Sequence, residues 1–256
     1  MSKIGKKSSR TPKRPDRAAS NDGRRRPGLS RELAVLYEDD AVIVVNKPAG
    51  LLAVPIKGSK TPSALSLVSA HLNQTRQRAL IVHRIDRFVS GILLFAKSAT
   101  DREALVKQFL EHTPERQYLA VVRGRPEAEA GTLVHYFRRE GMFQQLRTAK
   151  DPTAARAELR YAVERVFAEA SLVRVELETG LQNQIRVQFA ALGCPVIGDR
   201  KYSRAELAEP LIDRVALHAA HLQFVHPRTG ENVSIECELP DDFEYLISKL
   251  KPMPIQ

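Results

Sequence analysis

Asp86 is the residue of this sequence best suited to chemistry. It lies in the segment His83–Arg87, with Arg84 and Arg87 close on either side, directly before Gly91–Lys97, the most apolar run of the chain. Neighbouring guanidinium groups keep a carboxylate ionised. An ionised carboxylate can stabilise or capture the positive charge that develops on a sugar when a glycosidic bond breaks, and the arginines suit a substrate rich in phosphate. An isolated aspartate here more often braces a turn, so this segment alone leaves both interpretations open.

A second polar segment, Thr179–Arg186, begins a predicted amphipathic helix. Gly180 opens the segment and Arg186 falls in the first turns, which places a cation beside whatever the N-terminus of the helix faces. Taken alone, this pattern is equally typical of a solvated helix face.

The elements that position these segments follow from apolar periodicity and turn residues. Thr61 and Pro62 are typical of a helix start, and Gly193 is typical of a helix end. Strands and helices are interspersed, but many consecutive strands have hairpin links. The sequence therefore predicts an α+β domain with a mixed, largely antiparallel sheet and flanking helices. We expect strands at 34–36, 41–45, 91–97, 118–122, 157–167, 172–178, 221–225 and 233–239, and helices at 61–73, 101–111, 182–192 and 241–250.

Charge and cysteine content indicate the domain organisation of the protein and the cellular compartment in which it works. The chain has 256 residues and a net charge of +10. Residues 1–30 hold ten basic and two acidic side chains, a net +8, and show no apolar period, so we expect a disordered basic tail followed by one catalytic domain at 31–256. The tail is either a solubilising extension or a polycation that finds phosphates. Two cysteines, no secretory signal and no apolar run near the roughly 18 residues of a membrane span favour a cytoplasmic protein.

Several familiar motifs fail. Gly58–Thr61 resembles the end of a phosphate loop but lacks the glycines of its cradle. His83–Asp86 lacks the spacing and companions of a kinase catalytic loop. The sequence holds no His-Glu-x-x-His, Cys/His cluster, Gly-x-Ser-x-Gly or Gly-x-Gly-x-x-Gly pattern. We therefore expect neither a metal site nor an organic cofactor.

Together, the ordered segments resemble the RluA-type RNA pseudouridine synthases from about Leu33 to the C-terminus. The catalytic-type segment, His83–Asp86 with Ser90–Lys97, is the most specific. The others are Tyr37–Leu51, Gln117–Ala120, Leu177–Arg186 with Gly193–Pro195 and Gly198–Asp199, and His218–Ala219 with Phe224–Glu231. The resemblance implies the family's mixed sheet with a central cleft, an RNA substrate (rRNA or tRNA), and isomerisation of uridine to pseudouridine. A monomer is the default expectation.

The resemblance also implies site roles. Asp86 is the expected catalytic carboxylate, Tyr118 stacks on the target uracil, and Arg186 pairs with Asp86. Tyr118 is also a candidate base for the C5 proton, though a weak one unless its pKa is shifted. Arg84 is expected to fill the gap left by the extruded base, which costs a few kcal/mol to unstack. The remaining expected substrate-binding residues are His83, Ile85, Arg87, Ile185, Gln184 and Lys47.

Four positions depart from the family pattern: Leu181, Asn183, Gln188 and Val89. None is among the residues expected to take part in the chemistry. Leu181 stands where an arginine is usual, which removes an expected contact with RNA. We also expect no S4-type RNA-binding domain before the catalytic region. Two alternatives stay open: a catalytically silent RNA-binding or ribosome-assembly protein on the same scaffold, and an unrelated glycosidase or nucleosidase. The latter needs a second carboxylate opposite Asp86, for which the sequence offers no obvious candidate.

Overall fold

The strands of the described chain form one mixed sheet in the order β1-β2-β4-β10-β5-β9-β8-β6-β7. The computed structural model describes residues 33–73, 77–141, 143–203 and 211–253, so the predicted tail, residues 1–30, lies outside the described residues. Its strands are β1 (Ala34–Glu38), β2 (Val42–Lys47), β3 (Leu80–Ile81), β4 (Ser90–Ala96), β5 (Glu115–Arg123), β6 (Ala130–Glu140), β7 (Phe143–Arg147), β8 (Ala155–Val166), β9 (Ala170–Leu177), β10 (Leu217–Val225) and β11 (Asn232–Glu236).

A seam divides the sheet where β4 meets β10. The two strands run parallel and pair at His218 with Ser90 and at Ala219 with Gly91, whereas the other described pairs are antiparallel. Beyond this short contact β10 pairs with β11, and the far end of β4 pairs with β3. The segment that carries Asp86 therefore enters β4 at the point where the two halves of the sheet touch.

Gly91 makes this contact possible. Its φ is +110°, and a Cβ built on it would lie 2.2 Å from the carbonyl oxygen of Ala219. Any side chain here would push the strands apart, and the left-handed φ is itself costly for other residues.

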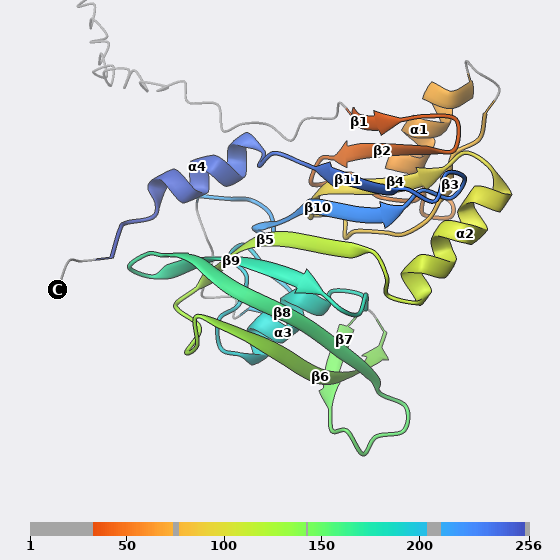
Figure 1. Ribbon diagram of the computed structural model, residues 1–256. Helices are drawn as coiled ribbons and strands as arrows, with labels where there is room; N and C mark the ends of the chain where they lie inside the picture. The colour runs from red at the N-terminus through yellow and green to blue at the C-terminus, as the bar shows by residue number, and fades with distance from the viewer. Residues whose placement is uncertain (1–32, 74–76, 142, 204–210, 254–256) are drawn as a thin grey trace, which may run out of the picture.

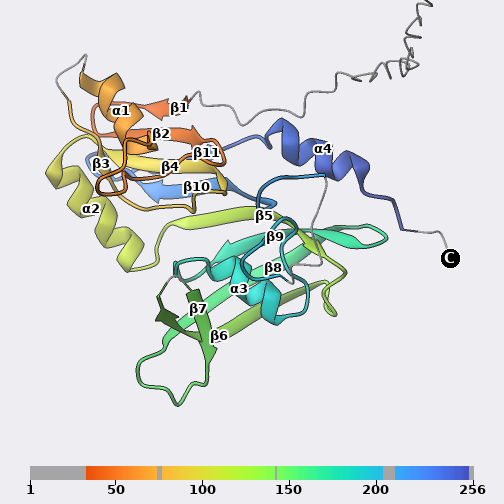
Figure 2. The same ribbon diagram turned by 180° about the vertical axis from the view of Figure 1, so that it is seen from behind.

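Two helices cover the half of the sheet that holds β2 and β4, as Figures 1 and 2 show. Helix α1 (Ala64–Leu72) buries Val68 and Leu72 in a cluster that also holds Phe95 of β4. It begins at the Ser63 N-cap, whose side chain accepts from the backbone N–H of Ser66, so the start predicted at 61 was wrong by a few residues. Helix α2 (Ala99–Leu110) follows β4 directly and packs in the main core.

The other two helices support the second half of the sheet and the end of the chain. In α3 (Gln184–Ala191), Ile185 and Phe189 enter the main core, while Val187 packs on Phe137 of β6. Helix α4 (Asp241–Lys249) buries Phe243 and Leu246. The predicted fold class is confirmed, but strands β6 and β7, which extend the sheet beyond β8, were missed by the sequence analysis. None of the described helices is long and apolar enough to cross a membrane.

Candidate active site

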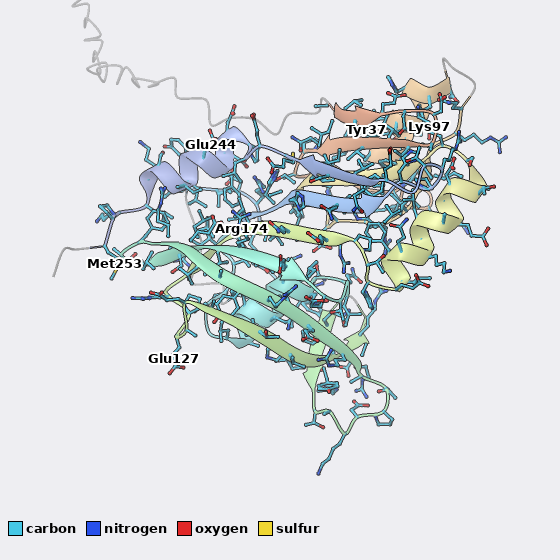
Figure 3. The ribbon with its side chains drawn as sticks, in the orientation of Figure 1. Tyr37, Lys97, Glu127, Arg174, Glu244 and Met253 are labelled. Atoms are coloured by element: carbon cyan, nitrogen blue, oxygen red, sulfur yellow. The ribbon has the colours of Figure 1, made fainter. Side chains whose placement is uncertain are left out.

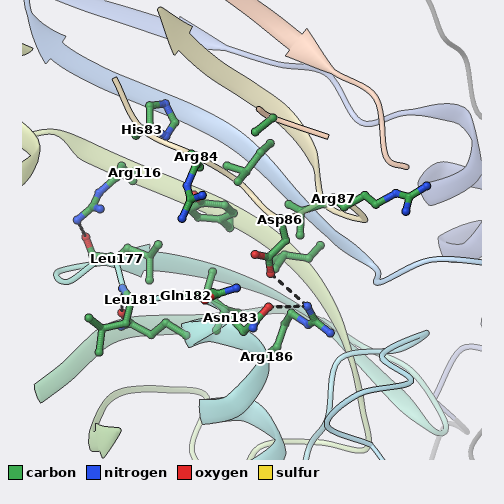
Figure 4. Close-up of a pocket in the computed structure, with 18 of the residues that line it drawn as sticks. His83, Arg84, Asp86, Arg87, Arg116, Leu177, Leu181, Gln182, Asn183 and Arg186 are labelled. Carbon is green, nitrogen blue, oxygen red and sulfur yellow. Dashed lines mark hydrogen bonds and ion pairs between the residues drawn. The ribbon is translucent and has the colours of Figure 1, made fainter. Parts of the chain in front are cut away.

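A cleft of about 780 Å³ lies along the seam, between the Asp86 segment and the start of α3 (Figure 4). One wall comes from residues 52–56, 83–89 and the end of α2, and the other from 180–186, with Tyr118 and Leu217 between them. Asp86 is the single carboxylate among the described residues that line it. The described lining residues therefore offer no second carboxylate opposite Asp86 of the kind that a glycosidase uses.

The geometry brings Asp86 and Arg186 together across 100 residues of sequence. Nη1 of Arg186 donates to Oδ2 of Asp86 at 3.1 Å. Asp86 lies in the turn before β4, where its carbonyl accepts from the N–H of Val89 at 3.1 Å, and Arg186 is the third residue of α3. The carboxylate remains about a quarter exposed, so it is open to the cleft while paired.

Arg186 is itself held by a second, fully buried carboxylate. Its Nε and Nη2 donate to the two oxygens of Asp199, each at 2.8 Å, and Asp199 is only 1% exposed. Burial disfavours the charged arginine, but the hydrogen bonds and charges of Asp199 and Asp86 outweigh it and raise the pKa of Arg186. The guanidinium is therefore a permanently charged, fixed donor to Asp86.

Tyr118 forms the floor of the cleft from the middle of β5. Burial raises the pKa of its phenol; the charge of Arg116 opposes this rise and that of Asp86 adds to it. Tyr118 is thus a neutral phenol at pH 7, and the shift is opposite to the one a base for the C5 proton needs. Its ring remains available as an aromatic surface, and Ile85 and Ile185 are buried in the apolar walls.

The two arginines beside Asp86 lie differently. Arg84 is exposed and extends over the cleft, whereas the guanidinium of Arg87 points away from Asp86 (Figure 4). Nε of Arg87 donates to the carbonyl of Gly50 at 2.9 Å and its guanidinium lies 5.3 Å from the centre of the Phe88 ring. Arg87 therefore fixes the Asp86 loop to the segment after β2. It also lines the cleft, and its contact with substrate stays a prediction.

Lys47 is not in the cleft, which corrects its predicted role. Its side chain is fully buried, and Nζ donates to the carbonyls of Pro48 and Leu51 at 3.0 Å and of Arg87 at 3.2 Å. Burial lowers the pKa of Lys47 to about 7. The ammonium group ties the end of β2 to the Asp86 loop from beneath.

Gln184 and His83 line the cleft, and each has a side-chain polar atom bound to the protein. Oε1 of Gln184 accepts from Thr179 and Leu181, and its Nε2 donates to the carbonyl of Glu158 at 2.9 Å. Nε2 of His83 accepts from the N–H of Leu94, and burial together with the charge of Arg116 lowers its pKa to about 3. The amide of Gln184 is therefore held by the protein, and one ring nitrogen of His83 is fixed by the backbone of β4.

Comparison with known proteins identifies the family. The sequence pattern described as RNA pseudouridylate synthase matches residues 41–191. The chain belongs to this family, in its RluA-type branch. The predicted enzyme class, an RNA pseudouridine synthase, is thereby confirmed.

Relatives and solved structures agree with this family. A protein of Zymomonas mobilis subsp. mobilis named ribosomal large subunit pseudouridine synthase D is 33% identical over 230 residues, which cover 85% of this chain and 73% of that protein. An uncharacterized RNA pseudouridine synthase of Bacillus subtilis is 37% identical over 225 residues, covering 86% and 73%. The structure titled Human RNA Pseudouridylate Synthase Domain Containing 4 superposes with a TM-score of 0.70 at 21% identity, over 84% of this chain and 92% of that one, which shows the same fold.

Within this pseudouridylate synthase scaffold, Asn183 is the departure that touches the ion pair. Its Oδ1 accepts from Nη1 of Arg186 at 2.7 Å, and its Nδ2 donates to the hydroxyl of Tyr202 at 3.2 Å. The same hydroxyl accepts from the N–H of Gln144 in β7 at 3.1 Å. Asn183 adopts φ +57°, a conformation that asparagine tolerates well. A chain of hydrogen bonds thus runs from β7 to Asp86.

The other departures lie outside this network. Val89 is buried in the main core. Gln188 is fully buried, and its Nε2 donates to the carbonyl of Leu133 at 2.8 Å, which holds α3 on β6. Leu181 lines the cleft and packs partly on Val187. Leu181 is the departure that places an apolar side chain in the wall of the cleft.

The sequence analysis missed three site residues. Asp199 was part of the resemblance but received no role, Tyr202 was not considered, and Arg116 was unnoticed beside Tyr118. The alternation of side chains along β5 could have predicted that Arg116 lies beside Tyr118, because residues two apart share one face of a strand. Among the described residues, no three His, Cys, Asp or Glu side chains converge on a position suited to a metal ion.

Proposed function

We propose that the protein isomerises uridine to pseudouridine in ribosomal RNA and that Asp86 is the reacting carboxylate. The observation that carries the proposal is the 3.1 Å pair between Asp86 and Arg186 in a cleft whose floor is Tyr118. The names of relatives that act on the large ribosomal subunit support the substrate class.

The chemistry requires little beyond these side chains. The bond from N1 of uracil to C1′ of ribose breaks, a bond from C5 to C1′ forms, the hydrogen on C5 leaves as a proton, and N1 takes one up. Asp86 meets the positive charge that develops at the sugar. The aromatic face of Tyr118 and the extended Arg84 offset the cost of unstacking the target base.

Release of tritium from RNA labelled at uracil C5 tests both parts of the proposal. The substrates are unmodified transcripts of large-subunit rRNA, small-subunit rRNA and tRNA, and the proteins are wild type, Asp86→Ala and Asp40→Ala. Asp40 is an exposed carboxylate outside the cleft and serves as the matched control. We expect release from large-subunit rRNA by wild type and Asp40→Ala, and none by Asp86→Ala.

Other outcomes separate the alternatives. Release by Asp86→Ala at the wild-type rate would overturn the catalytic assignment. Release from tRNA alone would overturn the ribosomal substrate while keeping the reaction. Binding of RNA without release from any substrate would establish the silent RNA-binding alternative.

A further inference from the structure

Arg116 is a buried cation in the cleft that the reaction described above does not use. It precedes Tyr118 by two residues on β5, so both side chains lie on the same face of the sheet. The residue is 8% exposed and lines the cleft. In Figure 4 it lies at the end of the cleft away from Arg186, with Arg84 between them.

One edge of the guanidinium is anchored and the other is not. Nη2 donates to the carbonyls of Leu177 and Glu178 at 3.0 and 3.2 Å, and the group lies 5.8 Å from the centre of the Phe109 ring. Nε has no hydrogen-bond partner, and within the described residues Nη1 makes no hydrogen bond either. Nη1 lies over Gly180, where a Cβ would be 2.8 Å away.

The charge of Arg116 has no ion-pair partner in the described part of the chain. Glu178, whose charge favours the cation, directs its carboxylate to Arg160 at 2.7 Å. Burial lowers the pKa of Arg116, and the charges of Tyr118 and Glu178 oppose this effect. Buried arginines are almost always paired, so a fixed, unpaired guanidinium facing a cleft indicates an anionic ligand.

We propose that Arg116 binds a phosphodiester of the RNA strand next to the nucleotide held against Tyr118. Nη2 fixes the guanidinium on the end of β9, and Nη1 is presented to a phosphate oxygen above Gly180. The inference rests on the proposed function, which places RNA in this cleft. An anion is favoured over a uracil carbonyl because the unpaired group carries a full charge, and phosphodiesters are the anions that RNA supplies.

The salt dependence of RNA binding tests this role. Binding of an unmodified large-subunit rRNA transcript is measured in an Asp86→Asn background, to prevent turnover, from about 50 to about 200 mM salt. Arg116→Met should weaken binding about tenfold or more at low salt and reduce the slope of log affinity against log salt by about one. Arg174→Met is the matched control, since Arg174 pairs opposite Leu119 and so faces the other side of the sheet (Figure 3); it should keep the parent slope.

Gly180→Ala provides a second variant that removes no charge. The added methyl group displaces the guanidinium from above residue 180, so binding should weaken several-fold and the slope should fall in part. It keeps the test decisive if Arg116→Met fails to fold by circular dichroism. Slopes equal to that of Arg174→Met for both variants would overturn the phosphate assignment and leave Arg116 a packing residue.

The same proteins with Asp86 restored separate this inference from the proposed function. Wild type that binds RNA but releases no tritium contradicts the proposed reaction, whatever the salt slopes. Wild type that releases tritium, together with an unchanged slope for Arg116→Met, contradicts only the role of Arg116.

Discussion

The two carboxylates that share Arg186 should have opposite roles in stability and activity. Asp199 is 1% exposed and holds Arg186 through two hydrogen bonds of 2.8 Å, and its Oδ1 also accepts from the N–H of Lys201 at 2.8 Å. The N–H of Tyr202 also donates to Oδ1 of Asp199, at 3.1 Å. Asp199→Ala therefore leaves Nε and Nη2 of a buried guanidinium, and two backbone N–H groups, without their partner. Breaking a buried pair on one side costs about 3 to 5 kcal/mol.

Asp86→Ala is the matched comparison, because it removes the same group from the same arginine. Asp86 makes one hydrogen bond of 3.1 Å and is a quarter exposed, and Arg186 keeps Asp199 and Asn183. We expect a loss of about 0 to 1 kcal/mol in the free energy of unfolding. Activity should follow the reverse order: Asp86→Ala abolishes tritium release, while Asp199→Ala lowers kcat more than it changes KM.

Urea denaturation followed by circular dichroism measures the difference. With a slope of about 3 kcal/mol/M for a chain of this size, Asp199→Ala should lower the midpoint by about 1 to 2 M, and Asp86→Ala by about 0.3 M or less. Equal shifts for the two variants would refute the reasoning that burial separates the roles. A shift below about 0.3 M for Asp199→Ala would refute its assignment as the anchor of Arg186.

Three further predictions use other parts of the same scaffold. Gly91→Ala should lower the free energy of unfolding, measured by chemical denaturation, by more than about 3 kcal/mol, because it adds a backbone clash to a left-handed φ. Gly230→Ala, at φ +74° with no atom within 4 Å of the added Cβ, should lower it by about 1 to 2 kcal/mol. Equal losses for the two variants would contradict the clash. Burial lowers the pKa of His218 to about 4, so on acidification the unfolded chain takes up this proton at a higher pH than the folded chain does. The free energy of unfolding should therefore be full above about pH 6.5 and fall by about 3 kcal/mol towards pH 4. His218→Asn should flatten this fall when urea titrations are repeated at several pH values. Tyr202→Phe removes the hydroxyl that Asn183 donates to but keeps the ring beside Arg186, so kcat should fall about 3- to 10-fold with KM unchanged; a change in KM alone would contradict a positioning role.

Strands buried on both faces were predictable from the sequence, whereas β6 and β7 were not. The apolar runs at 41–45 and 91–97 correspond to β2 and β4, which are buried almost throughout. Strands β6 and β7 alternate exposed and half-buried residues and carry several arginines, so their sequence shows no apolar run. They are stable as strands because β6 pairs with β8 along eight residue positions, a long-range pairing that local sequence cannot show.

The candidate site could be predicted in its chemistry but not in its supports. Asp86, Tyr118 and Arg186 came from the family resemblance, and the structure brings all three to one cleft. Lys47 was misplaced because residue type does not reveal whether an ammonium group points into a cleft or beneath a loop. Asp199 was given no role because its partner lies 13 residues away on another element, a distance that no periodic pattern links.

Asp199, the second carboxylate bound to Arg186, keeps the arginine paired when Asp86 reacts. If Asp86 bonds to or closely pairs with the sugar, its negative charge no longer balances the positive charge of Arg186. This happens while substrate fills the cleft and excludes water. A buried guanidinium whose sole partner was Asp86 would then be stranded, at a cost that would raise the barrier of the reaction. Because Asp199 keeps the arginine neutralised throughout, Asp86 can leave its single 3.1 Å hydrogen bond without leaving a buried charge unpaired. In the proposed reaction, Arg186 can therefore orient Asp86 while remaining paired with Asp199.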